Sequence, residues 1–168
     1  MSVQTTIRPA RPADIGAIRA LARRAWDATY EDLLDETTVA ETVAEWYADD
    51  ALREALDTPG TAFLVAEAGE DLLGFCHGVV LEDEGDVLRM YVDPDHWGEG
   101  VGTALHERLR DDLLDFNMRR MRAIVLADND IGNEFYRGLG FEKTGEGDVE
   151  LGGETYTENV YTKEFDRE

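Results

Sequence analysis

Apolar side chains recur along the N-terminal third of the chain with the period of an α-helix. Between Ile15 and Tyr30 they repeat every three to four positions, which predicts a helix with one apolar face. A second helix is predicted from Thr38, which can form a capping box with Glu41, and a third over 50–56. A short strand is predicted before them, over residues 4–9.

The remainder of the chain alternates strands and helices. Two apolar runs flank the turn Gly69-Glu70-Asp71 and predict an antiparallel hairpin. Hairpins combined with strand–helix–strand crossovers predict a mixed α/β (α+β) fold, with a central mixed sheet of six to seven strands and helices on both faces. No linker divides the chain, so we expect one domain over 1–168, with an N-terminal part at 4–60 and a sheet-rich part at 61–165. In the sheet-rich part, strands are predicted over 62–68, 72–81, 87–92, 121–127, 141–144 and 155–165, and helices over 101–116 and 130–139.

The predicted helix over 130–139 has two distinct faces. Asn129, Gly132 and Tyr136 share one face, which could line a groove, with the glycine leaving room for a ligand. Two simpler interpretations stay open, in which Asn129 only caps the helix and Tyr136 is a core tyrosine. The opposite face is expected to enter the core and carries Ile131, Phe135 and Leu139.

Charge is the most unusual property of the composition. The chain has 38 acidic and 16 basic residues, a net charge of −22, so we expect no nucleic-acid partner. Lys143 and Lys163 are its only lysines, and Glu107, Asp111 and Asp115 form a like-charged row along one predicted helix. This acidic, lysine-poor composition resembles that of proteins from extreme halophiles; the alternative is an ordinary solvated acidic face.

Other features limit the location and the chemistry. The lone cysteine, Cys76, lies in an apolar run and is expected to be a buried small residue, which suits a cytoplasmic protein without disulfides. The N-terminus lacks the apolar core of a signal peptide, and no apolar run is long enough to span a membrane. His77, His96 and His106 do not have the spacing of metal ligands, so no metal site is expected.

The segment from Tyr91 to Leu105 predicts a strand, a glycine-rich turn and the start of a helix. Glycines at 98, 100 and 102 allow backbone N–H groups to converge, and the helix adds its unpaired first-turn N–H groups, so the turn is suited to a phosphate or pyrophosphate. A Walker loop is excluded because no lysine follows the glycines. The G-x-G-x-G spacing also departs from a dinucleotide fingerprint, and Arg122 lies where its acidic residue is expected.

The neighbours of this turn carry a resemblance to a known family. The strand ends as Tyr91-Val92-Asp93-Pro94, the loop is 97–102, and further on Asn129, Phe135-Tyr136 and Gly140-Phe141 follow at fixed spacing. This arrangement resembles the GNAT superfamily of N-acetyltransferases, which use acetyl coenzyme A, closely over 60–165. Trp97 replaces the family's Gln or Arg, and Gly132 its usual alanine.

The resemblance implies a role for many residues. Tyr136 would be the general acid that protonates the leaving thiolate, and Asp86 the general base, with Glu84 and Glu82 as alternatives. Asn129 would contact the pantetheine arm, and an N–H near Val92 the thioester carbonyl. Residues implied to bind acetyl-CoA are Met90, Tyr91, Val92, Trp97, Gly98, Glu99, Gly100, Val101, Gly102, Thr103, Asn129 and Tyr136.

By the same analogy the first helices would select the acceptor, through Trp26 and Tyr30. Trp46 and Tyr47 are further candidates for the acceptor pocket, but a core position is favoured for Trp46. The implied reaction moves an acetyl group from acetyl-CoA to a primary amine of a small molecule or peptide. An inactive acyl-CoA-binding module, a longer acyl group and a homodimer formed through an edge strand stay open as alternatives.

Overall fold

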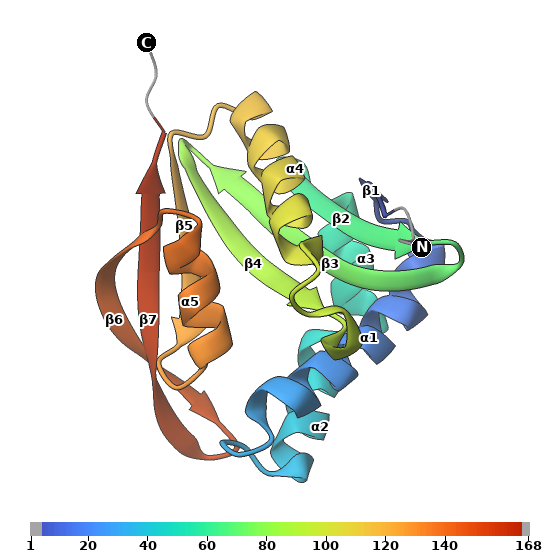
Figure 1. The fold of residues 1–168 in the computed structure, drawn as a ribbon, viewed down its shortest axis with the longest axis vertical. Helices are drawn as coiled ribbons and strands as arrows, with labels where there is room; N and C mark the ends of the chain where they lie inside the picture. Colours follow the sequence, from blue (N-terminus) through green and yellow to red (C-terminus); the bar gives the residue numbers. More distant parts are fainter. Residues whose placement is uncertain (1–4, 166–168) are drawn as a thin grey trace.

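The computed structural model describes residues 5–165, which form a single-domain α/β fold with one seven-stranded sheet and five α-helices (Figure 1). None of the helices in this part of the chain is long and apolar enough to cross a lipid bilayer. Two short 3-10 turns lie at Pro12–Asp14 and Pro94–His96. The elements in chain order are β1 (Thr6–Pro9), α1 (Ile15–Tyr30), α2 (Glu36–Trp46), α3 (Asp49–Asp57), β2 (Thr61–Ala68), β3 (Asp71–Leu81), β4 (Glu84–Val92), α4 (Val101–Asp115), β5 (Arg120–Leu126), α5 (Asp130–Gly138), β6 (Glu142–Leu151) and β7 (Glu154–Glu164).

The strands are arranged in the order β1-β2-β3-β4-β5-β7-β6. Every neighbouring pair is antiparallel except β4 and β5, which are parallel and are joined by the crossover helix α4. This confirms the expected mixed sheet. The single parallel pair lies at its centre, between two antiparallel parts of the sheet.

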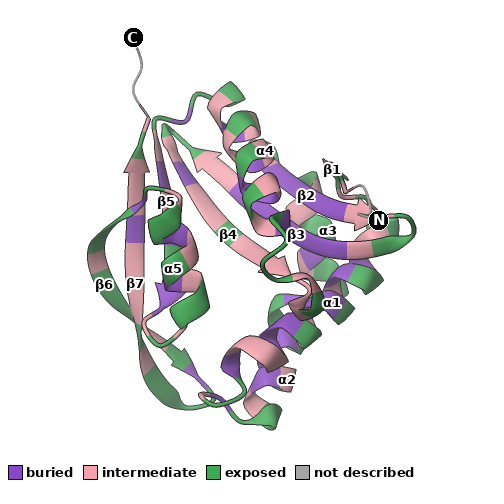
Figure 2. Cartoon of the chain, viewed as in Figure 1, coloured by how far each residue is buried: buried purple, intermediate pink, exposed green. Residues whose placement is uncertain are grey.

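The two faces of the sheet bury separate cores, and buried positions on β2 and β3 alternate between them (Figure 2). Phe63 and Phe75 pack with α1, α2 and α3 on one face. Leu64 and Cys76 pack with α4 and α5 on the other. The expected burial of Cys76 is confirmed, because its side chain is 0 % exposed.

The parallel pair β4–β5 is short, and its end determines where a ligand can enter. It extends only from Glu84 opposite Arg120 to Val87 opposite Ala123, although both strands continue further. A register shift between β3 and β4 at His77 and Gly78 marks a bulge at this point. Beyond it β4 and β5 diverge (Figure 1), so backbone groups in the middle of the sheet are left without a partner strand.

Several boundaries differ from the expectations. Helix α2 begins at Glu36 rather than Thr38, because the Asp35 side chain accepts a hydrogen bond from the Thr38 N–H and caps the helix there. Helix α3 likewise begins one residue before the expected start. Strand β6 runs through to Leu151, well past the predicted 141–144. Gly145 and Gly147 inside it do not have positive φ, whereas Gly152 and Gly153 in the turn after it do. Because β6 is an edge strand, it pairs with β7 alone, and glycines inside it disrupt the sheet less than they would in a central strand.

Candidate active site

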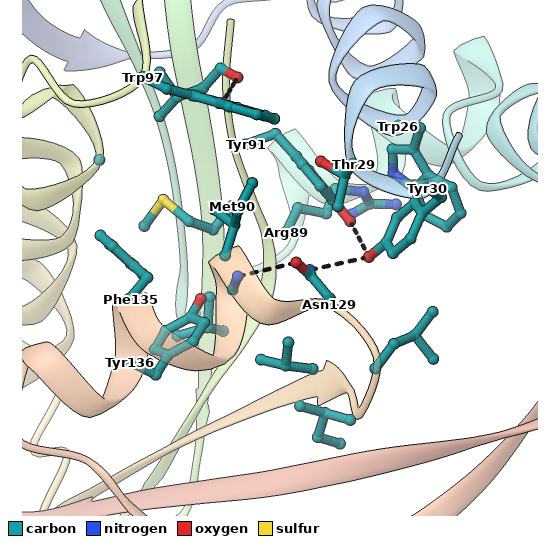
Figure 3. Close-up of a pocket in the computed structure, with 18 of the residues that line it drawn as sticks. Trp26, Thr29, Tyr30, Arg89, Met90, Tyr91, Trp97, Asn129, Phe135 and Tyr136 are labelled. Atoms are coloured by element: carbon teal, nitrogen blue, oxygen red, sulfur yellow. Dashed lines mark hydrogen bonds between the residues drawn. The ribbon is translucent and has the colours of Figure 1, made fainter. Parts of the chain in front are cut away.

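A cavity of about 500 Å³ opens where β4 and β5 diverge (Figure 3). The ends of both strands, helix α1, the glycine turn, helix α5 and strands β6 and β7 contribute to its lining. Pockets of this size accommodate a small-molecule ligand or part of a larger one. The cavity contains most of the residues that the sequence singled out, and several that it did not.

The glycine turn has the geometry of an anion site. Gly98 and Gly100 have φ values of 81° and 85°, and Gly100 is the left-handed N-cap of α4. The Ala104 N–H donates the first helical hydrogen bond, to the Gly100 carbonyl, so the N–H groups at 101–103 have no partner within the helix. These N–H groups and the positive end of the helix dipole together suit a phosphate-bearing ligand.

Trp97 connects this turn to the end of β4. Its indole N–H donates a hydrogen bond of 3.0 Å to the Val92 carbonyl, and its ring lines the cavity (Figure 3). The side chain that replaces the family's polar residue therefore has a structural role, which the sequence did not reveal.

The backbone of β4 presents polar groups to the cavity. The Asp93 N–H donates to the Leu73 carbonyl on β3. Because hydrogen-bonding directions alternate along an antiparallel strand, Val92 and Met90 direct their N–H groups away from β3, toward the space left by β5. A ligand carbonyl in this space can accept a hydrogen bond without displacing a strand contact.

Helix α5 is rotated relative to the expected orientation. Ile131 is 52 % exposed, whereas Tyr136 is 6 % exposed and Asn133 3 %, so the prediction of a core position was wrong for Ile131. Phe135 and Leu139 are half-buried and pack against the core, as predicted. Asn133, which the sequence analysis did not consider, occupies the core because every polar atom of its side chain is hydrogen-bonded. Tyr136 is both buried and part of the cavity lining.

Tyr136 reaches the cavity from the core side. Its ring packs against Phe135, Phe141 and Tyr161. Within residues 5–165 no hydrogen bond to its hydroxyl is found, and Figure 3 shows the hydroxyl directed toward the cavity. Burial raises the pKa of this hydroxyl above its usual value, so the group is a neutral proton donor near neutral pH.

Asn129 caps α5, as the simpler interpretation predicted. Its Oδ1 accepts a hydrogen bond of 2.9 Å from the Gly132 N–H, and its Nδ2 donates to the Tyr30 hydroxyl at 3.4 Å. That hydroxyl also lies 3.4 Å from the hydroxyl of Tyr91 (Figure 3). An added Cβ at Gly132 would lie 2.7 Å from Asn129 Nδ2 and 2.9 Å from Val125 Cγ1, so this glycine makes room for side chains rather than for a ligand.

One end of the cavity, next to helices α1 and α2, is closed by aromatic side chains. We call this group the aromatic wall; it consists of Trp26, Tyr30, Trp46 and Tyr91. The ring centroid of Trp26 lies 4.8 Å from that of Tyr30, 5.5 Å from that of Trp46 and 6.1 Å from that of Tyr91. Trp46 is 41 % exposed and lines the cavity, so its favoured core position was wrong. A wall of this kind contributes apolar area and ring faces that attract cations.

The structure does not bring the predicted base to the cavity. The carboxylate of Asp86 lies 2.9 Å from Arg122 Nε, in the paired part of β4 and β5. The alternative Glu84 is paired with Arg120 at 3.1 Å, and neither it nor Glu82 lines the cavity.

Two charged residues that the sequence analysis did not place in the site line the cavity. Glu158 on β7 is its only lining carboxylate within the described residues, and Arg89 on β4 its only lining arginine. Burial and the charge of Asp148 raise the pKa of Glu158. Both residues lie on predicted strands that also carry apolar residues, and this was the signal that could have pointed to them. With 38 acidic residues in the chain, however, no single carboxylate stood out.

The sequence model of the acetyltransferase (GNAT) family matches residues 24–141. The chain belongs to this family. It is accordingly an acetyl-CoA-dependent N-acyltransferase, which confirms the resemblance to the GNAT superfamily.

Individual relatives of this GNAT protein are distant. Spermidine N(1)-acetyltransferase of Thermoplasma acidophilum is 24 % identical over 146 residues, which cover 84 % of this chain and 89 % of that protein. Thialysine N-epsilon-acetyltransferase of Bos taurus is 27 % identical over 147 residues, covering 80 % and 82 %.

Solved structures agree on the fold. The PaiA N-acetyltransferase of Thermoplasma acidophilum in complex with coenzyme A superposes with a TM-score of 0.85 at 22 % identity, covering 96 % of this chain and 99 % of that one. The putative acetyltransferase YncA of Salmonella typhimurium with acetyl-CoA gives a TM-score of 0.68 at 22 % identity, covering 98 % and 95 %.

Proposed function

We propose that this GNAT protein transfers an acetyl group from acetyl-CoA directly to a primary amine, with both substrates bound in the cavity between β4 and β5. The observation that carries the proposal is the position of the buried Tyr136 hydroxyl in a cavity that also reaches the glycine turn. Anion-binding backbone at one end and an unengaged proton donor in the middle suit a thioester whose other end carries phosphates.

The donor is proposed to bind mainly through backbone groups. The N–H groups of residues 98–103 would receive the pyrophosphate, and those of Met90 and Val92 would face the pantetheine arm and the thioester carbonyl. Trp97 and Asn129 border the same path. A donor held in this way needs no lysine, which agrees with a cavity that no lysine of residues 5–165 lines.

The reaction requires three proton movements. An amine that arrives as an ammonium first loses a proton to a base, which releases it to water, because only the neutral nitrogen has a lone pair. That nitrogen attacks the thioester carbon, charge on the carbonyl oxygen is stabilised by a backbone N–H of β4, and the C–S bond breaks. Tyr136 gives its proton to the leaving thiolate, and the nitrogen loses a second proton, which returns through the base to Tyr136. We assign the role of base to Glu158, which lines the cavity, ahead of Asp86, which is engaged with Arg122.

The acceptor is proposed to be a cationic small molecule or a peptide amine. The relatives named above act, by their names, on spermidine and thialysine, which both carry primary amines. The aromatic wall and Glu158 are suited to the ammonium form in which such an amine arrives.

Release of free thiol from acetyl-CoA, measured with spermidine, thialysine and peptides with free N-termini, tests the function. Tyr136→Phe should lower kcat roughly 100-fold, as expected for loss of a general acid, while coenzyme A binding stays within about twofold. Tyr156→Phe is the control, since this hydroxyl donates a hydrogen bond to Glu154 at the surface. Full activity of Tyr136→Phe would remove its assigned role, and no turnover of any amine by the wild type would favour an acyl-CoA-binding module.

A further inference from the structure

Arg89 is exceptional among the arginines of the sheet. The other arginines on described strands, Arg8, Arg120 and Arg122, all form ion pairs with carboxylates. Within residues 5–165, Arg89 forms none. Within the described residues Arg11, Arg19, Arg119 and Arg137 also form no ion pair, but none of them lines the cavity. An unpaired positive charge at the cavity of a chain with 38 acidic residues is what requires an explanation.

The groups that hold Arg89 are all uncharged. One guanidinium nitrogen lies 2.7 Å from His77 Nδ1, another donates to the Trp46 carbonyl at 2.9 Å, and the group lies 5.2 Å from the centre of the Tyr47 ring. Burial and the charge of Arg89 lower the pKa of His77 to about 3, so the imidazole stays neutral and accepts the bond. The half-buried positive charge is therefore oriented but not neutralised.

Arg89 extends from β4 toward the aromatic wall (Figure 3). Its contacts with Trp46 and Tyr47 put it on the α2 side of that wall, whereas Glu158 acts on the Tyr30 side, where its charge affects the Tyr30 hydroxyl. The two side chains line one cavity without forming an ion pair with each other. A guanidinium has five N–H donors, so Arg89 keeps donors for a further partner.

We propose that the acceptor carries a carboxylate as well as the reacting amine, and that Arg89 binds this carboxylate. The inference rests on the proposed function, and it narrows the acceptor to amino acids and related amino carboxylates. A pure polyamine would bring a second positive charge to the cavity and leave Arg89 unneutralised. The glycine turn, which suits the phosphates of the donor, follows the end of β4, whereas the Arg89 side chain is held on the α2 side of the cavity by Trp46 and Tyr47.

Matched acceptors that differ only in the carboxylate test this inference. The pairs are lysine and cadaverine, ornithine and putrescine, and tyrosine and tyramine, with kcat/KM measured by thiol release. The wild type should prefer the carboxylated member of at least one pair by about tenfold or more, and Arg89→Gln should reduce that ratio to near one. Arg89→Lys should restore part of it, because a charge returns without the planar fork.

Arg53→Gln is the matched control, since Arg53 lies on the exposed face of α3 and pairs with Asp49. Its carboxylate preference should equal that of the wild type. Melting temperature and coenzyme A binding, measured for each variant, identify loss of folding. If amines are acetylated without any carboxylate preference, or if Arg89→Gln keeps the preference while folded, the inference is overturned and the proposed function stands.

If no acceptor is turned over, the proposed function fails first. The inference is then decided by calorimetric titration of the same pairs into the protein loaded with coenzyme A. Tighter binding of lysine than of cadaverine, lost in Arg89→Gln, supports it, and equal binding across all pairs overturns it.

Discussion

The amide oxygen of Asn133 accepts a hydrogen bond of 2.7 Å from the Tyr161 hydroxyl, which joins α5 to β7 inside the core. The same oxygen accepts from Asn159, and the amide nitrogen donates to the carbonyls of Leu126 and Asn129 at 3.0 and 2.7 Å. This network fixes the segment between β5 and α5, and with it the direction in which Tyr136 faces the cavity.

Asn133→Ala should lower the free energy of unfolding by about 2–3 kcal/mol, because it leaves buried donors and acceptors unpaired. Chemical denaturation in molar KCl measures the effect. Glu134→Ala, at the next and exposed position of the same helix, should change stability by less than about 0.5 kcal/mol. Equal stability of the two variants would show that the network contributes little.

Glu158→Gln should abolish the acid limb of the pH profile of kcat/KM for the amine. Since burial and Asp148 raise the pKa of Glu158, the limb in the wild type should lie above the range of an ordinary glutamate. Activity should fall roughly 100-fold, as is usual for loss of a general base.

Glu154→Gln is the control for Glu158, because it lies on the same strand but is exposed. Asp86→Asn separates the two candidate bases. If Asp86→Asn abolishes the acid limb and Glu158→Gln leaves it unchanged, Asp86 is the base despite its ion pair with Arg122.

The dissociation constant for coenzyme A should fall as KCl rises from dilute to molar concentration. The ligand is polyanionic and the protein has a net charge of −22, so their long-range repulsion is reduced as the screening length shortens from about 10 Å at 0.1 M to about 3 Å at 1 M. Calorimetry measures the constant, with circular dichroism to show that the protein stays folded.

Pantetheine, which lacks the phosphates, serves as the matched ligand for the salt experiment and should bind with little salt dependence. A constant that stays flat or rises for coenzyme A would contradict the electrostatic explanation. The same titration also tests what the acidic composition does. If the acidic surface repels coenzyme A, binding should be tight only at the molar salt to which such a composition is suited.

His106 should make the protein sensitive to acid. It is 2 % exposed on α4, and burial together with Arg110 and Lys163 lowers its pKa to about 4. The unfolded chain binds a proton near pH 6.5 that the folded chain does not bind until about pH 4, so this stability is present above pH 6.5 and is lost as the pH falls. Between pH 7 and 5 the loss is about 2 kcal/mol for this single group.

Comparing unfolding of the wild type and His106→Gln at pH 7 and 5, in molar KCl, isolates that contribution. The variant should lose less stability on acidification. His96→Gln is the comparison of opposite sign, because the hydrogen bond to Glu99 raises the pKa of His96 and this residue stabilises the folded protein as the pH falls. That variant should lose slightly more stability than the wild type on acidification. An unchanged slope in His106→Gln would mean that the folded protein protonates this imidazole normally.

The order of elements and the glycine turn were predictable from the sequence because each depends on local rules. Periodicity locates a helix such as α1, and glycines that must adopt positive φ mark the turn before α4. The orientation of α5 was not predictable in this way. Its core face includes the polar Asn133, which bonds to the Leu126 backbone on β5 and to the distant Tyr161 on β7. Apolar residues alone did not reveal this position and placed Ile131 in the core instead.

The charged residues of the cavity show a second limit. Asp86 was selected by its place relative to the strand start, but pairing with Arg122 depends on how far β4 and β5 stay together. Glu158 and Arg89 reach the cavity because the strands diverge beyond Val87. A divergence of this kind depends on strand register, which the sequence of either strand alone does not specify.

The end of pairing between β4 and β5 also creates an edge inside the sheet. Edges normally lie at the rim, where charged side chains discourage other strands from adding to them. This one is flanked by apolar side chains such as Met90 and Val125, and within residues 5–165 no strand covers it. The proposed function puts the pantetheine arm of acetyl-CoA here, and its amides would then supply the hydrogen-bond partners that a neighbouring strand supplies elsewhere in the sheet.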